Sequence, residues 1–190
     1  MAVKDFILAS GSPQRKRLLE QIGLIPKSIE AADIDESCKK GETATAYVKR
    51  MALEKALKVS ALHPGEIILG GDTIVVAGGK ILHKAKNDEE QTQVMRLLSG
   101  RAHRVISAVC VVDRSGRASL RCVSTRILMK KLSEEEIKGY VASHEWVGCV
   151  GYKIEGELAG FVKKMIGSYT GVIGLPLFET KNLLNGVGIK

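Results

Sequence analysis

The chain has 190 residues, of which 45% are hydrophobic, and its mean hydropathy is +0.03. We expect a globular protein in which residues 1–190 form a single domain with a sizeable core. A net charge of +8 attracts anions such as phosphates or nucleotides without choosing among them. Only 4% of the residues are aromatic, which argues against a surface that stacks nucleic-acid bases.

The cysteines and the first residues limit the class of protein further. No CxxC pair and no nearby His pair with zinc-ligand spacing accompanies Cys38, Cys110, Cys122 or Cys149, so we expect buried or half-buried thiols. The start of the chain carries charges and only a short apolar run, which predicts no signal peptide and no membrane contact. A reducing cytoplasm is the expected location.

The first predicted elements are a strand, a tight turn and a helix. Apolar residues 6–9 predict the strand, and the sequence SGSP at 10–13 predicts the turn. Apolar residues at helical spacing, closed by Gly23, predict the helix. A long second helix is predicted from about Thr43 to Leu62.

The rest of the chain predicts hairpins and three more helices. Residues 66–84 predict a strand with a kink at its paired glycines and a hairpin that returns through residues 80–82. Later elements are a helix over 88–98, two long strands over 102–131, a helix from Ser133 with a capping-box pattern, and a last helix after Pro176. The predicted class is therefore α/β, with a mixed twisted sheet and flanking helices.

The turn SGSP gathers hydrogen-bond donors and cations. Ser12 before Pro13 is typical of an N-cap followed by proline at the first helical position. Three of the residues 14–17 (Gln-Arg-Lys-Arg) are basic, although a helix N-terminus favours acidic side chains. Unpaired backbone N–H groups of the first helical turn, together with these cations, would bind a chain of phosphate groups. A plain helix start with solvated cations is the alternative, and both interpretations stay open here.

Asp72 is a lone carboxylate inside the apolar, strand-like stretch GGDTIVV. Burial of such a group is costly unless it meets a cation or a metal, or serves as a base. The alternative is an aspartate in a turn at the end of a strand. The neighbouring glycines are compatible with both, since they would also let a ligand approach the backbone.

Lys55 falls in the centre of an apolar helical stripe formed by Val48, Met51, Ala52, Val59 and Leu62. Its side chain either extends along the surface to water or reaches an anion in a cleft. Lys84 offers a second cation. Glu36, in an acidic cluster, offers a second carboxylate for a divalent ion.

Helix N–H groups, several cations and two carboxylates together indicate phosphoryl chemistry. The sequence contains no GxxxxGK[ST], no GxGxxG after a strand, no HExxH and no GxSxG. A kinase or a P-loop hydrolase is therefore not expected.

Six motifs in order resemble the Maf proteins, a family of nucleoside triphosphate pyrophosphatases. They are SGSPQRKRLL, DIDES, EKA at 54–56, GGDTIVV, LSGRAHRV and GSYTGVIGLPLFET, and the resemblance runs from about residue 6 to residue 184. The resemblance implies a Maf/Ham1 (ITPase-like) fold with a cleft between two lobes. It also implies hydrolysis of a nucleoside triphosphate to the monophosphate and pyrophosphate, a divalent Mg²⁺ or Mn²⁺, and a homodimer.

By position, the resemblance also assigns roles to residues. Asp72 matches the catalytic acid, interpreted as the base that activates water and as a metal ligand, and Glu36 matches the motif glutamate, the second metal ligand. Lys55 and Lys84 match the two lysines that face the phosphates. The substrate-binding loop contains Ser10, Ser12, Gln14 and Arg15. Water would attack the α-phosphorus while pyrophosphate leaves.

The positions that select the base depart from a single pattern. Gln14 stands where the pyrimidine branch of the family has arginine, whereas Thr73 matches that branch. Glu155 resembles the branch acting on 7-methylguanosine triphosphate, because a carboxylate accepts hydrogen bonds from guanine. Ala85 replaces a proline, and residues 148–151 look one residue short. A modified or non-standard nucleotide fits this mixture, and no base is assigned.

Three alternatives remain at this point. The inosine triphosphate pyrophosphatase type performs the same chemistry, but the SGSP and GGDT motifs favour Maf. A catalytically impaired, nucleotide-binding regulator of cell division is compatible with Gln14, Ala85 and the short loop, whereas retention of Asp72 and Lys55 opposes it. A nucleic-acid binder has the least support.

Overall fold

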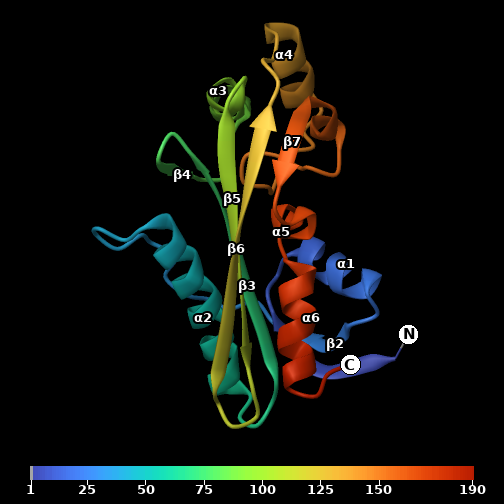
Figure 1. Cartoon of the computed structure of the whole chain (residues 1–190). Helices are drawn as coiled ribbons and strands as arrows, with labels where there is room; N and C mark the ends of the chain where they lie inside the picture. The colour runs from blue at the N-terminus through green and yellow to red at the C-terminus, as the bar shows by residue number, and fades with distance from the viewer. Residues whose placement is uncertain (1) are drawn as a thin grey trace.

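A mixed sheet of seven strands forms the centre of the computed structural model, which describes residues 2–190 (Figure 1). The strands are β1 (Val3–Ala9), β2 (Ile25–Ile29), β3 (Ile68–Ala77), β4 (Lys80–Leu82), β5 (Ala102–Val112), β6 (Ala118–Met129) and β7 (Val162–Ile166). Their order is β2-β1-β3-β5-β6-β7, with β4 paired to β3. β1 pairs in parallel with β2 and β3, and the other pairs are antiparallel. The predicted mixed α/β class is confirmed.

Helices cover both faces of the sheet. They are α1 (Pro13–Gln21), α2 (Ala44–Leu62), α3 (Asp88–Leu98), α4 (Glu134–Ala142), the 3₁₀ helix η1 (Glu157–Phe161), α5 (Tyr169–Ile173) and α6 (Leu177–Gly186). α2 packs on one face, and α1 and α6 pack on the other (Figure 1). Within residues 2–190, no helix is both long and apolar enough to cross a membrane.

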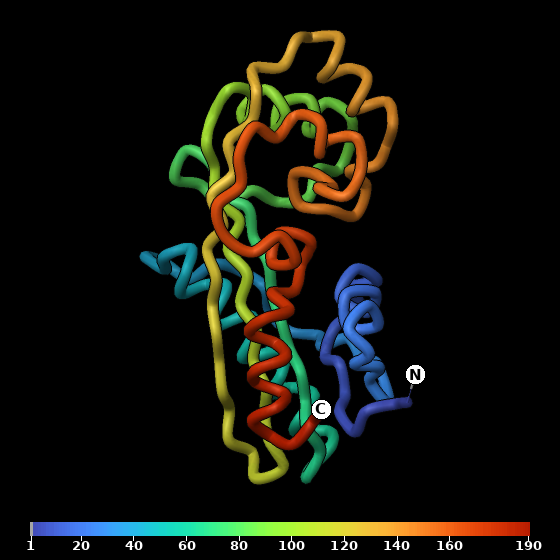
Figure 2. The backbone as a smooth tube through the Cα atoms, turned by 45° about the vertical axis from the view of Figure 1, so that its right-hand side comes forward, coloured from blue at the N-terminus to red at the C-terminus, as the bar shows by residue number. Residues whose placement is uncertain are grey.

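The long strands β3, β5 and β6 carry two lobes. One lobe contains α1, α2 and α6, whose apolar side chains pack on opposite faces of the sheet. The other contains α3, α4 and the segment 143–161, which share a third core cluster. Figure 2 shows this second lobe at the top and the first below it, with the strands running between them.

Some elements differ from the prediction. β1 begins at Val3, before the apolar run, and β2 and α5 were not predicted. β2 is a short edge strand that contains Pro26, a composition that argues against a strand in the sequence. α5 has five residues, too few to show a helical period.

The glycine pair at 70–71 does not kink the strand. β3 runs through both residues, and the chain reverses instead at Gly78 and Gly79, which have φ of 56° and 79°. A Cβ on Gly70 would lie 2.8 Å from the carbonyl oxygen of Ala52, so this glycine lets α2 approach the sheet. At Gly70 the close approach is therefore made by a helix and not by a ligand, whereas Gly71 faces Ala108, Leu175 and Arg15.

Two predictions of burial are corrected. Leu62, the last residue of the predicted stripe, is 60% exposed because α2 ends there. Cys38 is exposed, since it lies in the loop before α2, whereas Cys110 is buried and Cys122 and Cys149 are half-buried.

His103 on β5 makes stability depend on pH. Its side chain is buried, Nε2 lies 2.5 Å from the hydroxyl of Tyr152, and Nδ1 has no partner among residues 2–190. Burial lowers the pKa of His103 from 6.5 to about 4. As the pH falls below 6.5, His103 of the unfolded chain becomes protonated before His103 of the folded protein. The free energy of unfolding should therefore fall by about 3 kcal/mol between pH 6.5 and pH 4.

Urea unfolding across this pH range, on the wild type and on His103→Gln, measures the effect. The variant should lose the part of the pH dependence that His103 contributes, because glutamine does not titrate. A difference in stability between the two proteins that stays constant with pH would contradict the assignment.

Candidate active site

A cleft of about 810 Å³ lies between the lobes, at the edge of β3 that β1 and β4 leave uncovered. Its walls come from the segments 9–15 and 31–36 of one lobe and from 147–155 of the other. All of the predicted site residues line it, namely Ser10, Ser12, Gln14, Arg15, Glu36, Lys55, Asp72, Thr73, Lys84 and Glu155. The structure therefore brings together groups that are far apart in the sequence.

The turn before α1 presents free N–H groups to the cleft. Ser12 is the N-cap residue and Pro13 opens the helix, as predicted. The Ser12 hydroxyl does not cap the helix, because it donates to the side-chain oxygen of Gln14 at 3.0 Å. The first-turn N–H groups thus receive no side-chain acceptor and are available to an anionic ligand.

Arg15 is the cation of this turn that enters the cleft. Its Nε–H donates to the carbonyl of Gly174 at 2.9 Å, and Nη1 donates to Oγ of Ser10 at 2.8 Å. A guanidinium has five N–H donors, so three remain without a partner among residues 2–190. Burial lowers the pKa of Arg15, while the charges of Asp72 and Glu36 act in the opposite direction. These free donors suit phosphate oxygens.

The other two predicted cations of the turn point elsewhere. Lys16 lies 3.7 Å from Glu20, one helical turn away, and its side chain is exposed. Arg17 lies 3.7 Å from Oε1 of Glu155 at the rim of the cleft. The three-cation phosphate site predicted from the sequence therefore has one cation, Arg15.

Lys55 joins the two predicted carboxylates. Its Nζ lies 2.8 Å from Oδ1 of Asp72 and 2.9 Å from Oε1 of Glu36. The Lys55 side chain is only 12% exposed, so it does not extend to water. Asp72 lies within β3 opposite Ala108, which excludes the interpretation as a turn residue. The ion pairs explain how a charged residue occupies the apolar stripe of α2.

Lys84 approaches from the opposite wall. It follows β4, its residue is exposed, and it makes no ion pair within 4.0 Å in the part of the chain that the structure describes. A ligand in the cleft would therefore have Arg15 on one side and Lys84 on the other.

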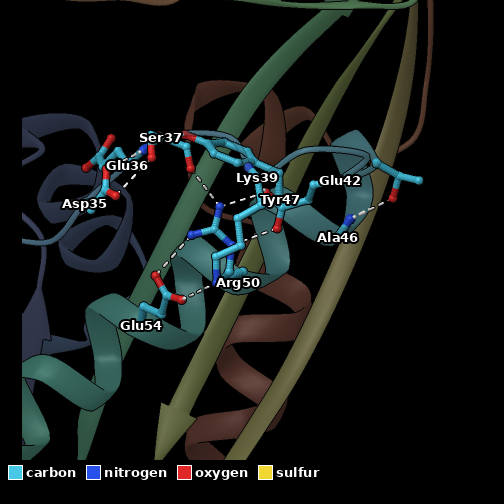
Figure 3. Close-up of polar contacts among 10 residues, drawn as sticks. Asp35, Glu36, Ser37, Lys39, Glu42, Ala46, Tyr47, Arg50 and Glu54 are labelled. Atoms are coloured by element: carbon cyan, nitrogen blue, oxygen red, sulfur yellow. Dashed lines mark hydrogen bonds and ion pairs between the residues drawn. The ribbon is translucent and has the colours of Figure 1, made fainter.

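The loop that carries Glu36 is fixed to α2 (Figure 3). Arg50 donates to both carboxylate oxygens of Glu42 at 2.7 Å, and also to the carbonyl of Ser37 at 2.9 Å. The guanidinium lowers the pKa of the Glu42 carboxyl to about 2. This bidentate pair closes the loop, so that Glu36 lies near Lys55.

Tyr47 is a site residue that the sequence reasoning missed. Its hydroxyl donates to the carbonyl of Glu36 at 2.8 Å, and the ring lines the cleft. Burial, with a smaller effect of Asp72, raises the pKa of Tyr47 to about 12. Tyr47 precedes Lys55 by two helical turns and therefore lies on the same face of α2. The helical spacing that singled out Lys55 was thus a signal for Tyr47 as well.

Three of the residues expected to select the base, Gln14, Thr73 and Glu155, also line the cleft. Thr73 is 2.9 Å from the hydroxyl of Ser107 and donates to the carbonyl of Gly174 at 3.2 Å. Glu155 is at the rim with Arg17. The short loop at 148–151 lines the cleft, whereas Ala85 does not.

A mixed α/β sheet whose interlobe cleft presents an arginine, three lysines, helix N–H groups and three carboxylates defines a protein with a cleft suited to phosphorylated ligands. The chain belongs to the Maf family, because the family model for Maf-like proteins matches residues 5–187.

Named relatives are similar to this chain over nearly its whole length, and a solved structure shares its fold. The chain is 44% identical to the dTTP/UTP pyrophosphatase of Caulobacter vibrioides, over 97% of this chain and 96% of that protein. It is 47% identical to the dTTP/UTP pyrophosphatase of Nitrobacter hamburgensis, over 96% and 91%. A HAM1 protein from Coxiella burnetii shares the fold, with a TM-score of 0.52 at 16% identity over 98% of this chain and 100% of that chain.

Proposed function

We propose that this protein is a nucleoside triphosphate pyrophosphatase that hydrolyses dTTP and UTP to the monophosphate and pyrophosphate. The main support is the convergence of Lys55, Asp72 and Glu36 within 3 Å contacts beside the free donors of Arg15. The relatives named dTTP/UTP pyrophosphatase support the same reaction. The groups that we assign to turnover lie together in one cleft, which favours an enzyme over an impaired regulator.

Asp72 is proposed as the base. Lys55 engages Oδ1 of Asp72, and Oδ2 is left to hold a water molecule. Asp72 accepts a proton from this water as its oxygen bonds to the α-phosphorus. The bond from that phosphorus to the bridging oxygen breaks, and pyrophosphate leaves with the electron pair.

The cations of the cleft bind and orient the triphosphate. The free N–H donors of Arg15 and the first turn of α1 hold phosphate oxygens on one wall, and Lys84 neutralises the leaving pyrophosphate from the other. Lys55 keeps the two carboxylates in place. Because these groups are already fixed by protein contacts, little reorganisation accompanies the reaction.

The donor set fits a divalent metal that binds together with the substrate. No group of three or more His, Cys, Asp or Glu side chains converges within residues 2–190. Mg²⁺ commonly uses one or two carboxylates with substrate phosphates, and Asp72 and Glu36, which both line the cleft, would supply them. A bound Mg²⁺ or Mn²⁺ would neutralise charge on the phosphate oxygens.

The preference for a pyrimidine is proposed from the relatives and not from Glu155. Arg17 lies 3.7 Å from the Glu155 carboxylate, beyond hydrogen-bond distance, so this contact does not occupy the acceptors of Glu155. The relatives' printed activities favour dTTP and UTP. A single domain and a cytoplasmic location, both expected from the sequence, and a homodimer, implied by the family resemblance, complete the proposal.

Release of pyrophosphate from a panel of triphosphates tests the function. We expect turnover of dTTP and UTP with Mg²⁺ or Mn²⁺, and a loss of turnover in EDTA. CTP, GTP, ITP, 7-methyl-GTP and 5-methyl-UTP complete the panel. A preference for 7-methyl-GTP would indicate that Glu155 selects the base. Absence of turnover with every triphosphate of the panel would contradict the proposal that the protein is a pyrophosphatase.

A further inference from the structure

Ser107 is a buried hydroxyl that the reaction described above does not use. It lies on β5 directly opposite Thr73 of β3 and is 2% exposed. Its hydroxyl donates to the carbonyl of Gly171 at 2.5 Å and lies 2.9 Å from the hydroxyl of Thr73. Ser107 does not line the cleft, so it does not touch a bound nucleotide.

Two carbonyls of one segment connect Ser107 with Arg15. Ser107 donates to the carbonyl of Gly171, Thr73 donates to the carbonyl of Gly174 at 3.2 Å, and the Gly174 carbonyl also accepts the Nε–H of Arg15 at 2.9 Å. Each hydroxyl has one proton, so with these donors the 2.9 Å approach of Ser107 and Thr73 is a contact without a proton of its own. The carbonyls of Gly171 and Gly174 belong to the end of a helix, where carbonyls lack partners within the helix.

The segment that carries these carbonyls needs outside support. α5 has only five residues, which is too short to be stable alone. Glycines flank it, Gly167 with φ of 133° and Gly174 with φ of 143°, a backbone region that other residues rarely adopt. The position of the Gly174 carbonyl therefore depends on contacts with neighbouring strands, among them the bond from Ser107.

We propose that Ser107 is a positioning residue for the pyrophosphatase reaction, acting through α5 and the Gly174 carbonyl on the side chain of Arg15. This inference rests on the proposed function. Without the Ser107 hydroxyl, the buried carbonyl of Gly171 loses its donor, and α5 shifts to find another. The Gly174 carbonyl moves with it, and the free donors of Arg15 lose their fixed direction toward the triphosphate.

Kinetics of Ser107 variants test the proposal. Ser107→Ala should lower kcat/KM for dTTP or UTP about ten-fold, and Ser107→Thr, which keeps the hydroxyl, should restore it to within about two-fold. Thr180→Ala is the matched control. It removes another buried hydroxyl, which donates to the carbonyl of Pro176 at 2.8 Å within α6, and should leave kcat/KM unchanged.

A double-mutant cycle separates positioning from general stability. If Ser107 acts through Arg15, then Ser107→Ala should reduce kcat/KM little further in the Arg15→Ala background. The proposal would be overturned if the loss of kcat/KM in the double variant equalled the product of the losses in the two single variants. A kcat/KM of Ser107→Ala within two-fold of the wild type would also overturn it. Should circular dichroism show that Ser107→Ala is unfolded, Ser107→Cys, similar in size but a weak donor, replaces it with the same expectations.

The test also distinguishes this inference from the proposed function. If the wild type hydrolyses no triphosphate, the proposed function fails by itself. For the wild type, the two single variants and the double variant, calorimetry then measures the affinity for α,β-methylene-UTP, which requires no turnover. Weakened binding in Ser107→Ala, absent in the Arg15→Ala background, would support the positioning role, and equal binding would overturn it.

Discussion

Replacing Asp72 by asparagine should reduce kcat by a factor of about 10³ with the fold intact. Asparagine has nearly the same shape but cannot accept the proton of the attacking water. Lys55 keeps an ion pair with Glu36 in the variant, so the substitution leaves no unpaired buried cation. Release of pyrophosphate from dTTP or UTP gives kcat, and circular dichroism reports the fold.

The control for this prediction is Asp33→Asn. Asp33 is an exposed acid in the same lobe that does not line the cleft, so its neutralisation changes the net charge equally without touching the site. Its kcat should stay within about two-fold of the wild type. Binding of α,β-methylene-UTP should persist in Asp72→Asn. A kcat above about a tenth of the wild-type value would remove Asp72 from the role of base.

The charged centre of the site was predictable because its residues contradict their local pattern. Asp72 interrupts an apolar strand and Lys55 interrupts an apolar helical stripe, and burial of either charge requires a partner. The structure places Lys55 between Asp72 and Glu36, which accounts for both irregularities. The long antiparallel hairpin of β5 and β6 followed in the same way from strand patterns on either side of a turn.

Other parts of the site depend on contacts that local pattern does not contain. Arg15, Lys16 and Arg17 are neighbouring cations in the sequence, and the distant carbonyl of Gly174, together with the hydroxyl of Ser10, holds Arg15 in the cleft. Ser107 looks like an ordinary strand residue until α5 packs against it. Hydrogen bonds between segments so far apart in the chain are set by the assembled sheet.

Replacing Lys55 by methionine should lower kcat/KM by a factor of about 10²–10³. Methionine fills much of the same volume but leaves Asp72 and Glu36 without the cation that lies 2.8 and 2.9 Å from them. The carboxylates then repel each other and the triphosphate, which lowers both substrate affinity and transition-state stabilisation. The Asp72 carboxylate, largely buried, also loses its partner, which should destabilise the fold by about 2 kcal/mol.

Lys58→Met is the matched control, because Lys58 lies one turn further along α2 and is exposed. Both variants change the net charge by one and place methionine in the same helix, but only Lys55 faces the carboxylates. Steady-state kinetics and urea unfolding of the pair measure the difference. If both variants lose activity equally, the effect belongs to net charge or to the helix. A loss below ten-fold in Lys55→Met would mean that the carboxylates keep their arrangement without the ammonium group. The ion pairs of Lys55 with Asp72 and Glu36 would then follow from the fold and would not be required for activity.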